Sequence, residues 1–170
     1  MHKLAYTLTH CPDALWVQAL RQKYKLQGLC PLSIARNCCS PFWRALSNVW
    51  DSVRDNVSWI VGNGMDVNVW NDTWVPSLGP LRLWLRSSPL VVASLTFDDL
   101  LLHDRQWDVN RLSGSLLPEA IPFVVGIPPP LVGTCDVLSW NSTPAGNFTV
   151  ASAYARLLES VWEAIDPKWS

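Results

Sequence analysis

Residues 40–81 are SPFWRALSNVWDSVRDNVSWIVGNGMDVNVWNDTWVPSLGPL, and within this segment the hydrophobic period changes from helical to alternating. Ser40 is followed by proline, a pair typical of a helix start, and apolar residues recur at helical spacing from Phe42 to Val53. From Val57 onward apolar and polar residues alternate, which is typical of a strand. The segment therefore predicts a helix followed by a β-hairpin over about 57–70.

The turn of this hairpin is expected at Asn63-Gly64, because both central positions of a tight hairpin turn need a positive φ, which asparagine and glycine tolerate. The connection GNGMD is longer than two residues, so a bulge is expected beside the turn. Trp59 is expected to pair with Trp70 or Val69 across the two strands, and Trp74 to fold back over the hairpin. The segment thus predicts a tryptophan-rich β unit.

Another helix is predicted upstream, at DALWVQALRQKYK, residues 13–25. Its apolar side chains share one face, its polar side chains lie largely on the other, and Gly28 is the expected stop signal. Arg21, Lys23 and Lys25 are candidate contacts for nucleic-acid phosphates. The alternative interpretation of these three residues is a solvated basic rim.

The rest of the chain predicts short elements. Residues 81–95 are apolar without a clean period and are interrupted by Pro89, which favours irregular structure. Short helices are expected after them, one of which Asp108 is expected to cap. A second hairpin is expected over about 136–150, followed by an amphipathic helix over about 151–165. Together these patterns predict an α+β fold of mostly short helices with two small β-hairpins, irregular in part.

The composition is that of a folded protein. Of 170 residues, 49% are hydrophobic, 16% are charged and 11 are tryptophan, so the chain has ample surface to bury and is predicted to form one domain or two small ones. Its net charge of −1 excludes a polycation that coats nucleic acid. Residues 1–50 nevertheless hold six Lys or Arg and one Asp. That basic end is expected either to face phosphate or an acidic neighbour, or to be a solvated helix face.

Several classes of protein are excluded by what the sequence lacks. It has no run of about 18 apolar residues, so no membrane partner is expected. Its start lacks the apolar core of a signal peptide, so secretion is not expected. Five cysteines without regular spacing indicate reduced thiols. The chain is therefore predicted to be intracellular, in the nucleus or the cytoplasm.

The sequence contains no complete chemical site. No cysteine or histidine motif has the spacing of a metal site, and no nucleophile motif occurs, so we expect no metal, no cofactor and no catalytic residue. Asp98 and Asp99 are explained better as first-turn residues of a short helix than as a two-metal site. The tryptophans are either core residues or a platform for sugars or bases, and core packing is favoured because most lie on apolar stripes.

Three segments resemble, in order and spacing, the polyproteins of plant non-LTR (LINE-type) retrotransposons, in the region between reverse transcriptase and ribonuclease H. They are ALWVQALRQKY at 14–24, the whole of 40–81, and DVLSWNSTPAGNFTVASAY at 136–154. The second is similar to the family's W-x-x-G-N-G and W-x-D-x-W motifs, and the third to the opening of its reverse-transcriptase zinc-binding domain. The motif residues, expected to be structural, are Trp59, Gly62, Asn63, Gly64, Trp70, Asp72, Trp74, Trp140, Gly146, Phe148, Ser152 and Tyr154.

The resemblance implies four parts along the chain. Residues 1–56 are similar to a helical connector after the polymerase, and 57–80 to a tryptophan-rich hairpin unit. Residues 81–134 are similar to an irregular linker with short helices, and 135–170 to the start of the zinc-binding domain, truncated before its Cys/His ligands. The family's polymerase aspartates, ribonuclease H carboxylates and zinc ligands have no match here, so no catalytic or metal residue is carried over.

The resemblance therefore implies a non-catalytic connector or scaffold. In the parent polyprotein its partners are the flanking polymerase and ribonuclease H domains, with RNA or DNA as a candidate ligand. Two alternatives stay open from the residues alone. One is a nucleic-acid-binding module that acts through the basic N-terminal helix, and the other is a tryptophan-lined carbohydrate-binding domain.

Overall fold

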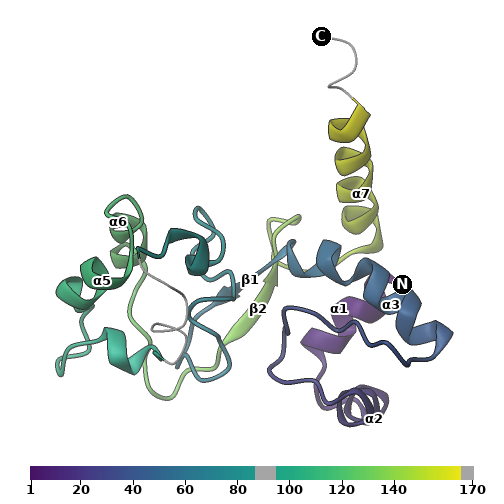
Figure 1. Cartoon of the computed structure of the whole chain (residues 1–170), viewed down its shortest axis with the longest axis horizontal. Helices are drawn as coiled ribbons and strands as arrows, with labels where there is room; N and C mark the ends of the chain where they lie inside the picture. Colours follow the sequence, from purple (N-terminus) through teal and green to yellow (C-terminus); the bar gives the residue numbers. More distant parts are fainter. Residues whose placement is uncertain (87–94, 166–170) are drawn as a thin grey trace. The chain divides into compact units, whose positions relative to one another are not determined.

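The computed structural model describes residues 1–86 and 95–165 (Figure 1). The chain divides into two compact units. The first combines residues 1–57 with the part of the chain from residue 139 onward, and we call it the helical unit. The second is the continuous segment 58–138, which we call the central unit.

Within the described residues, the α-helices of the helical unit are α1 (His2–His10), α2 (Leu15–Tyr24), α3 (Pro41–Arg54) and α7 (Val150–Ile165). The start of α3 is as predicted: the Ser40 side chain accepts a hydrogen bond from the Trp43 backbone N–H at 3.2 Å, and Pro41 occupies the first turn. Helix α1 has no counterpart among the predicted elements, and it packs against α3.

The core of the helical unit is aromatic. Trp43 and Trp50 of α3 are fully buried, and their indole N–H groups donate to the backbone carbonyls of Ile34 and Pro31, each at 2.8 Å. The buried stripe of α3 is formed by Trp43, Leu46, Trp50 and Val53. The expectation that Phe42 begins this stripe is wrong, since Phe42 is 38% exposed. Trp43 takes the buried position instead, because its larger indole fills the core and its N–H donates to the Ile34 carbonyl.

A two-stranded antiparallel sheet pairs β1 (Val57–Ile60) with β2 (Val137–Trp140). The predicted α+β class with mostly short helices is confirmed. The pairing differs from the prediction, however, because the two hairpins over 57–70 and 136–150 do not form as separate ladders. The first strand of each expected hairpin pairs instead with the first strand of the other.

Local side-chain bonds account for the missing return strand after β1. The Asn68 backbone N–H donates to the Asp72 carboxylate at 2.7 Å, and the Asn68 side-chain oxygen accepts from the Trp70 backbone N–H at 3.1 Å. Such bonds compete with a strand ladder. The chain after this loop still returns to β1, because the Trp59 backbone N–H donates to the Thr73 carbonyl at 2.7 Å. Trp59 and Trp70 are both buried, but they form no ring pair with each other within the described residues.

The residues expected to form the return strand after β2 lead into α7 instead. The Trp140 backbone N–H donates to the Gly146 carbonyl at 2.8 Å, so the chain does turn back. The Thr149 hydroxyl oxygen then accepts the Ser152 backbone N–H at 3.0 Å. This bond satisfies one of the amides that the first turn of a helix leaves free, so the chain enters α7 instead of extending as a strand.

The central unit contains η1 (Leu81–Trp84), η2 (Asp98–Leu100), α5 (Val109–Ser115) and α6 (Ile121–Val125). The predicted cap at Asp108 is present, because its side chain accepts the Arg111 backbone N–H at 3.1 Å. Residues 87–94 of the predicted linker, and residues 166–170, lie outside the described residues. Among the helices that are described, none is both long and apolar enough to cross a bilayer.

Candidate nucleic-acid interface

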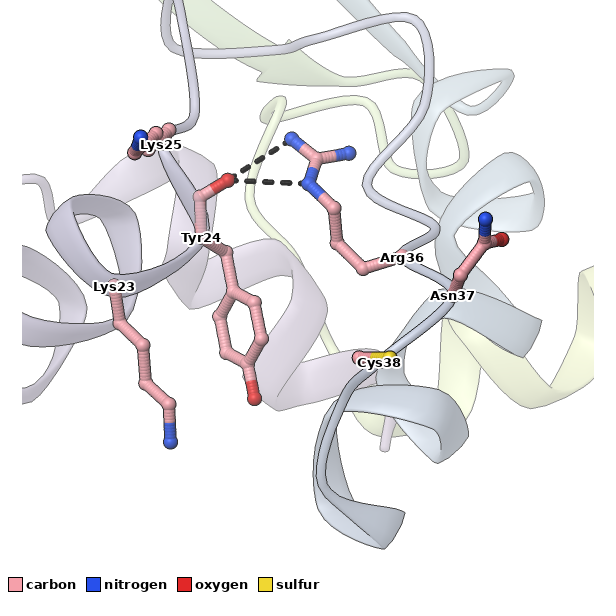
Figure 2. Close-up of a pocket in the computed structure, with 6 residues that line it drawn as sticks. All are labelled: Lys23, Tyr24, Lys25, Arg36, Asn37 and Cys38. Carbon is pink, nitrogen blue, oxygen red and sulfur yellow. Dashed lines mark hydrogen bonds between the residues drawn. The ribbon is translucent and has the colours of Figure 1, made fainter.

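Two of the three predicted basic residues line an open groove in the helical unit (Figure 2). The groove has a volume of ≈ 540 Å³, and its walls come from the end of α2 and from the segment before α3. We call it the basic groove. Its lining residues are Lys23, Tyr24, Lys25, Arg36, Asn37 and Cys38. Three of these are cations and none is acidic, so the local potential favours an anion.

The backbone at the end of α2 fixes one wall of the basic groove. Lys25 adopts the left-handed conformation, with φ 51° and ψ 51°. The Leu26 N–H donates to the Arg21 carbonyl at 3.0 Å, and the Lys25 N–H donates to the Gln22 carbonyl at 3.3 Å. This pair of bonds is a Schellman motif, which closes a helix. The expectation that Gly28 ends this helix is wrong, because Lys25 itself takes the positive φ at the cap.

Arg36 forms the opposite wall and was missed by the sequence prediction. Its Nε and Nη2 donate to the Tyr24 carbonyl at 3.2 and 2.9 Å (Figure 2). Its Nη1 donates to the Ala35 carbonyl at 2.7 Å. The carbonyl end of a helix carries partial negative charge, which a guanidinium stabilises. Arg36 lies in a segment without periodicity, so no local pattern signals that it returns to α2.

Tyr24 lies among the three cations of the basic groove, but its ring is buried in the core. The ring stacks on Trp43 with centroids 3.9 Å apart, and it is 7% exposed. Its phenol oxygen lies 3.3 Å from the Ser40 hydroxyl, and this bond, with a further one from the Ser40 backbone N–H, lowers the pKa of Tyr24. The Lys23 ammonium lies 5.4 Å from the ring centroid. The basic groove therefore offers charge and not an aromatic surface for base stacking.

Arg21, the third predicted contact, does not line the basic groove. Its guanidinium donates to the carbonyls of Leu8 at 3.4 Å and Leu29 at 3.5 Å, and also to the carbonyl of Gly28. Burial lowers the pKa of Arg21. The side chain thus ties α2 to the segments before and after it.

The G-N-G motif surrounds a carboxylate from another part of the sequence. The Asp136 carboxylate accepts the backbone N–H groups of Gly62, Gly64 and Asp66 at 2.6, 2.9 and 2.9 Å. We call this arrangement the carboxylate latch. Asn63 shapes the same loop, because its side-chain oxygen accepts the Met65 N–H at 3.0 Å. Asp136 was missed as a site residue, and its signal was its place as the first residue of the segment DVLSWNSTPAGNFTVASAY at 136–154.

The two glycines of this motif leave no room for a side chain. A Cβ at Gly62 would overlap the Cys135 carbonyl oxygen, which belongs to the backbone. Gly64 has φ +74°, and a Cβ there would lie 2.6 Å from the Phe97 ring. Their backbones can therefore approach the Asp136 segment closely.

The W-x-D-x-W residues are held by bonds within the central unit. The Trp70 indole N–H donates to the Leu95 carbonyl at 3.1 Å, and the Trp74 indole N–H donates to the Val69 carbonyl at 2.8 Å. Trp74 also stacks on Trp107, with centroids 5.7 Å apart. Together with the Asp72 bond to Asn68, these contacts fix the irregular chain after β1.

The motif residues after β2 pack in the helical unit. The Trp140 indole N–H donates to the Ser152 hydroxyl at 2.9 Å, and its ring meets Phe148 edge-on at 4.9 Å. Gly146 has φ +70°, and a Cβ there would overlap the Ser139 hydroxyl. Tyr154 differs from the others because it is 62% exposed.

The acids and thiols of the described residues have separate surroundings. No group of three or more His, Cys, Asp or Glu that could hold a metal ion occurs there. Asp98 pairs with Arg105 at 2.7 Å, while Asp99 accepts the N–H and the hydroxyl of Thr96, each at 2.8 Å. The two bonds from Thr96 lower the pKa of Asp99. All five cysteines are free thiols.

Most tryptophans whose surroundings are described lie in the core. The buried ones are Trp43, Trp50, Trp59, Trp70, Trp74, Trp107 and Trp140. An aromatic platform for sugars needs exposed rings, and Trp16 is 37% exposed. The described residues thus provide no row of exposed indoles for a carbohydrate.

Comparison with known proteins relates nearly the whole chain to a plant protein. The chain is 28% identical over 162 residues to the Arabidopsis thaliana protein named "Putative ribonuclease H protein". The match covers 91% of this chain and 26% of that protein, so the chain spans about a quarter of its relative's length. No family model matches the chain. No solved structure matches it either.

Proposed function

We propose that the chain is a non-catalytic connector of a plant non-LTR (LINE-type) retrotransposon polyprotein and that it contacts RNA or DNA phosphates through the basic groove. The similarity to a plant protein that carries the ribonuclease H name supports this origin, because it extends over 91% of the chain. The order of the three motif segments supports the region between reverse transcriptase and ribonuclease H. The flanking polymerase and ribonuclease H domains are then its partners, inside the nucleus or the cytoplasm.

The observation that carries the nucleic-acid contact is the charge of the basic groove. Lys23, Lys25 and Arg36 line it, no acid does, and the volume of ≈ 540 Å³ is open to a chain of phosphates. The Tyr24 ring is buried, so the expected contacts are to the backbone of the nucleic acid and not to its bases. Binding should therefore be independent of the base sequence of the nucleic acid and should weaken as the salt concentration rises.

The connector role is supported by what the motif residues do. The carboxylate latch joins residues 62–66 to the beginning of β2, and Trp140 joins β2 to α7 through Ser152. These side chains are used for packing and hydrogen bonding within their own unit. A scaffold needs such rigid connections, whereas a catalytic site needs groups that are free to meet a substrate.

Charge reversal in the basic groove is expected to weaken binding. For short oligo(U) and oligo(dT), we expect log Kd to rise with log salt with a slope on the order of 2–3, since about three phosphates are neutralised. The double variant Lys23→Glu/Lys25→Glu should bind at least about tenfold more weakly at low salt. Fluorescence anisotropy of labelled oligonucleotides measures both quantities.

The control for this experiment is Arg82→Glu, which reverses one exposed charge in the central unit. It should leave affinity within about twofold of the original chain. An affinity that is insensitive to salt, or an equal loss in the control, would show that the basic groove is not the contact surface.

The non-catalytic part of the proposal is tested with the intact chain. An RNA–DNA hybrid and a primed RNA template, each incubated with Mg²⁺ or Mn²⁺, should be neither cleaved nor extended. Cleavage or extension that EDTA abolishes, and that persists through further purification, would contradict the proposal.

A further inference from the structure

The backbone at Lys25 is unusual for a lysine. Among the described residues other than glycine, Lys25 and Arg105 have positive φ, at 51° and 64°. A side chain with a Cβ is disfavoured in this region, and glycine occupies it without that penalty. A glycine at the cap of α2 would therefore suit the fold better than the lysine that is present.

Arg105 shows how a fold can compensate for such a backbone. Its Nη1 donates to the Asp98 carboxylate at 2.7 Å, and its Nη2 donates to the Pro130 carbonyl at 3.0 Å. The side chain thus holds two segments of the central unit together. The Lys25 ammonium, in contrast, has no hydrogen-bond or ion-pair partner among the backbone and side-chain groups that the structure describes. Among the described side chains of the helical unit, none forms an ion pair with it.

The position of Lys25 is nevertheless well defined. The Schellman bonds from Lys25 and Leu26 close α2 at this point, and Arg36 donates twice to the carbonyl of the preceding residue, Tyr24. The cap therefore fixes the Lys25 Cα at the wall of the basic groove. Lys23, on the same wall, lies along the Tyr24 ring (Figure 2).

We infer that Lys25 holds a phosphodiester of the bound nucleic acid in the basic groove, and that it is kept in the left-handed conformation for this contact although glycine would give a more stable helix cap. The inference rests on the proposed function, because it names the residue through which the basic groove binds. A backbone conformation that costs stability is expected where the side chain has a task outside the fold. The ligand class is the sugar–phosphate backbone of RNA or DNA.

Replacing Lys25 by glycine should move stability and affinity in opposite directions. Removal of the backbone strain is expected to raise Tm by about 2–3 °C. Loss of one phosphate contact is expected to weaken binding of oligo(U) and oligo(dT) by about 3- to 5-fold and to lower the salt slope by about 1. Thermal unfolding by circular dichroism and anisotropy titrations between about 50 and 200 mM salt measure these changes.

Three further variants separate charge from backbone. Lys25→Ala should lose the same affinity without the gain in Tm, because alanine keeps the disfavoured Cβ. Lys25→Arg should keep the affinity within about twofold, since the charge is retained. Lys3→Ala removes an exposed lysine of α1 that does not line the basic groove, and it should leave both affinity and salt slope unchanged.

The outcomes distinguish this inference from the proposed function. If the original chain binds with the expected salt dependence and Lys25→Gly binds equally well, the inference is overturned and the proposed function stands on Lys23 and Arg36. If the original chain binds neither oligonucleotide at low salt, both are overturned. A gain in Tm together with a loss of affinity in Lys25→Gly, but not in Lys3→Ala, supports the inference.

Discussion

Replacing Trp43 by alanine is expected to lower the free energy of unfolding by about 3–5 kcal/mol. The side chain is fully buried, so its removal opens a cavity in the core of the helical unit. The Ile34 carbonyl also loses the indole N–H that lies 2.8 Å away, and Tyr24 loses the ring on which it stacks at 3.9 Å. Urea denaturation followed by far-UV circular dichroism measures the change.

Two variants show which part of Trp43 is responsible. Trp43→Phe keeps an aromatic ring but removes the indole N–H, and it should have a loss of about 1–3 kcal/mol. Trp16→Ala removes a tryptophan that is 37% exposed, and it should cost clearly less than Trp43→Ala. If Trp16→Ala and Trp43→Ala are equally destabilising, the core assigned to α3 is wrong. Because Trp43 supports Tyr24, Trp43→Ala should also weaken oligonucleotide binding.

Replacing Asp136 by alanine is expected to destabilise the central unit by about 2–4 kcal/mol. Its carboxylate accepts the three backbone N–H groups of the carboxylate latch, and hydrogen bonds to a charged group are each stronger than neutral ones. Without the carboxylate, those amides have to find water in a loop shaped to surround it. Hydrogen exchange followed by NMR should show loss of protection at Gly62 and Gly64.

The matched control lies in the same loop. Asp66→Ala removes an exposed carboxylate but keeps the Asp66 backbone N–H that the latch uses, so it should change stability by less than about 0.5 kcal/mol. Asp136→Asn keeps one acceptor oxygen and should fall between the two variants. Unchanged protection of the latch amides in Asp136→Ala would mean that the carboxylate does not organise the loop.

The elements that the sequence predicts correctly are those specified by neighbouring residues. Ser40 and Pro41 start α3, and Asp108 starts α5, because a cap involves side chains within three or four positions of the helix end. The stripe of α3 was predicted with the wrong first member, since Phe42 and Trp43 are both apolar. The choice between them depends on the Ile34 carbonyl, which helical periodicity cannot indicate.

The pairing of β1 with β2 could not be predicted from local patterns. The signals after β1 favour a hairpin, yet Asn68 and Asp72 bind the backbone that the return strand needs. The true partner strand follows Asp136, whose carboxylate is bound by a loop more than 70 positions earlier in the chain. Contacts over such separations leave no periodic trace in the sequence.

The candidate site was predicted in part for the same reason. Lys23 and Lys25 follow from the basic character of α2, and they line the basic groove. Arg21 has the same charge and lies on the same helix, but its guanidinium donates to the carbonyls of Leu8, Gly28 and Leu29. It therefore does not line the basic groove. Arg36 joins the site from a segment whose composition carries no charge pattern.

The antiparallel pairing of β1 with β2 also has a consequence for the order in which the chain can fold during synthesis. The central unit is continuous in sequence, so all of its residues have been translated before β2 is complete. The helical unit is interrupted, because Trp140 and Phe148, against which Tyr6 of α1 packs, are made after the whole central unit. Helix α1 can therefore pack against α3 early, but Tyr6 meets Trp140 and Phe148 only after the whole central unit is translated, so the unit that holds the basic groove is completed second.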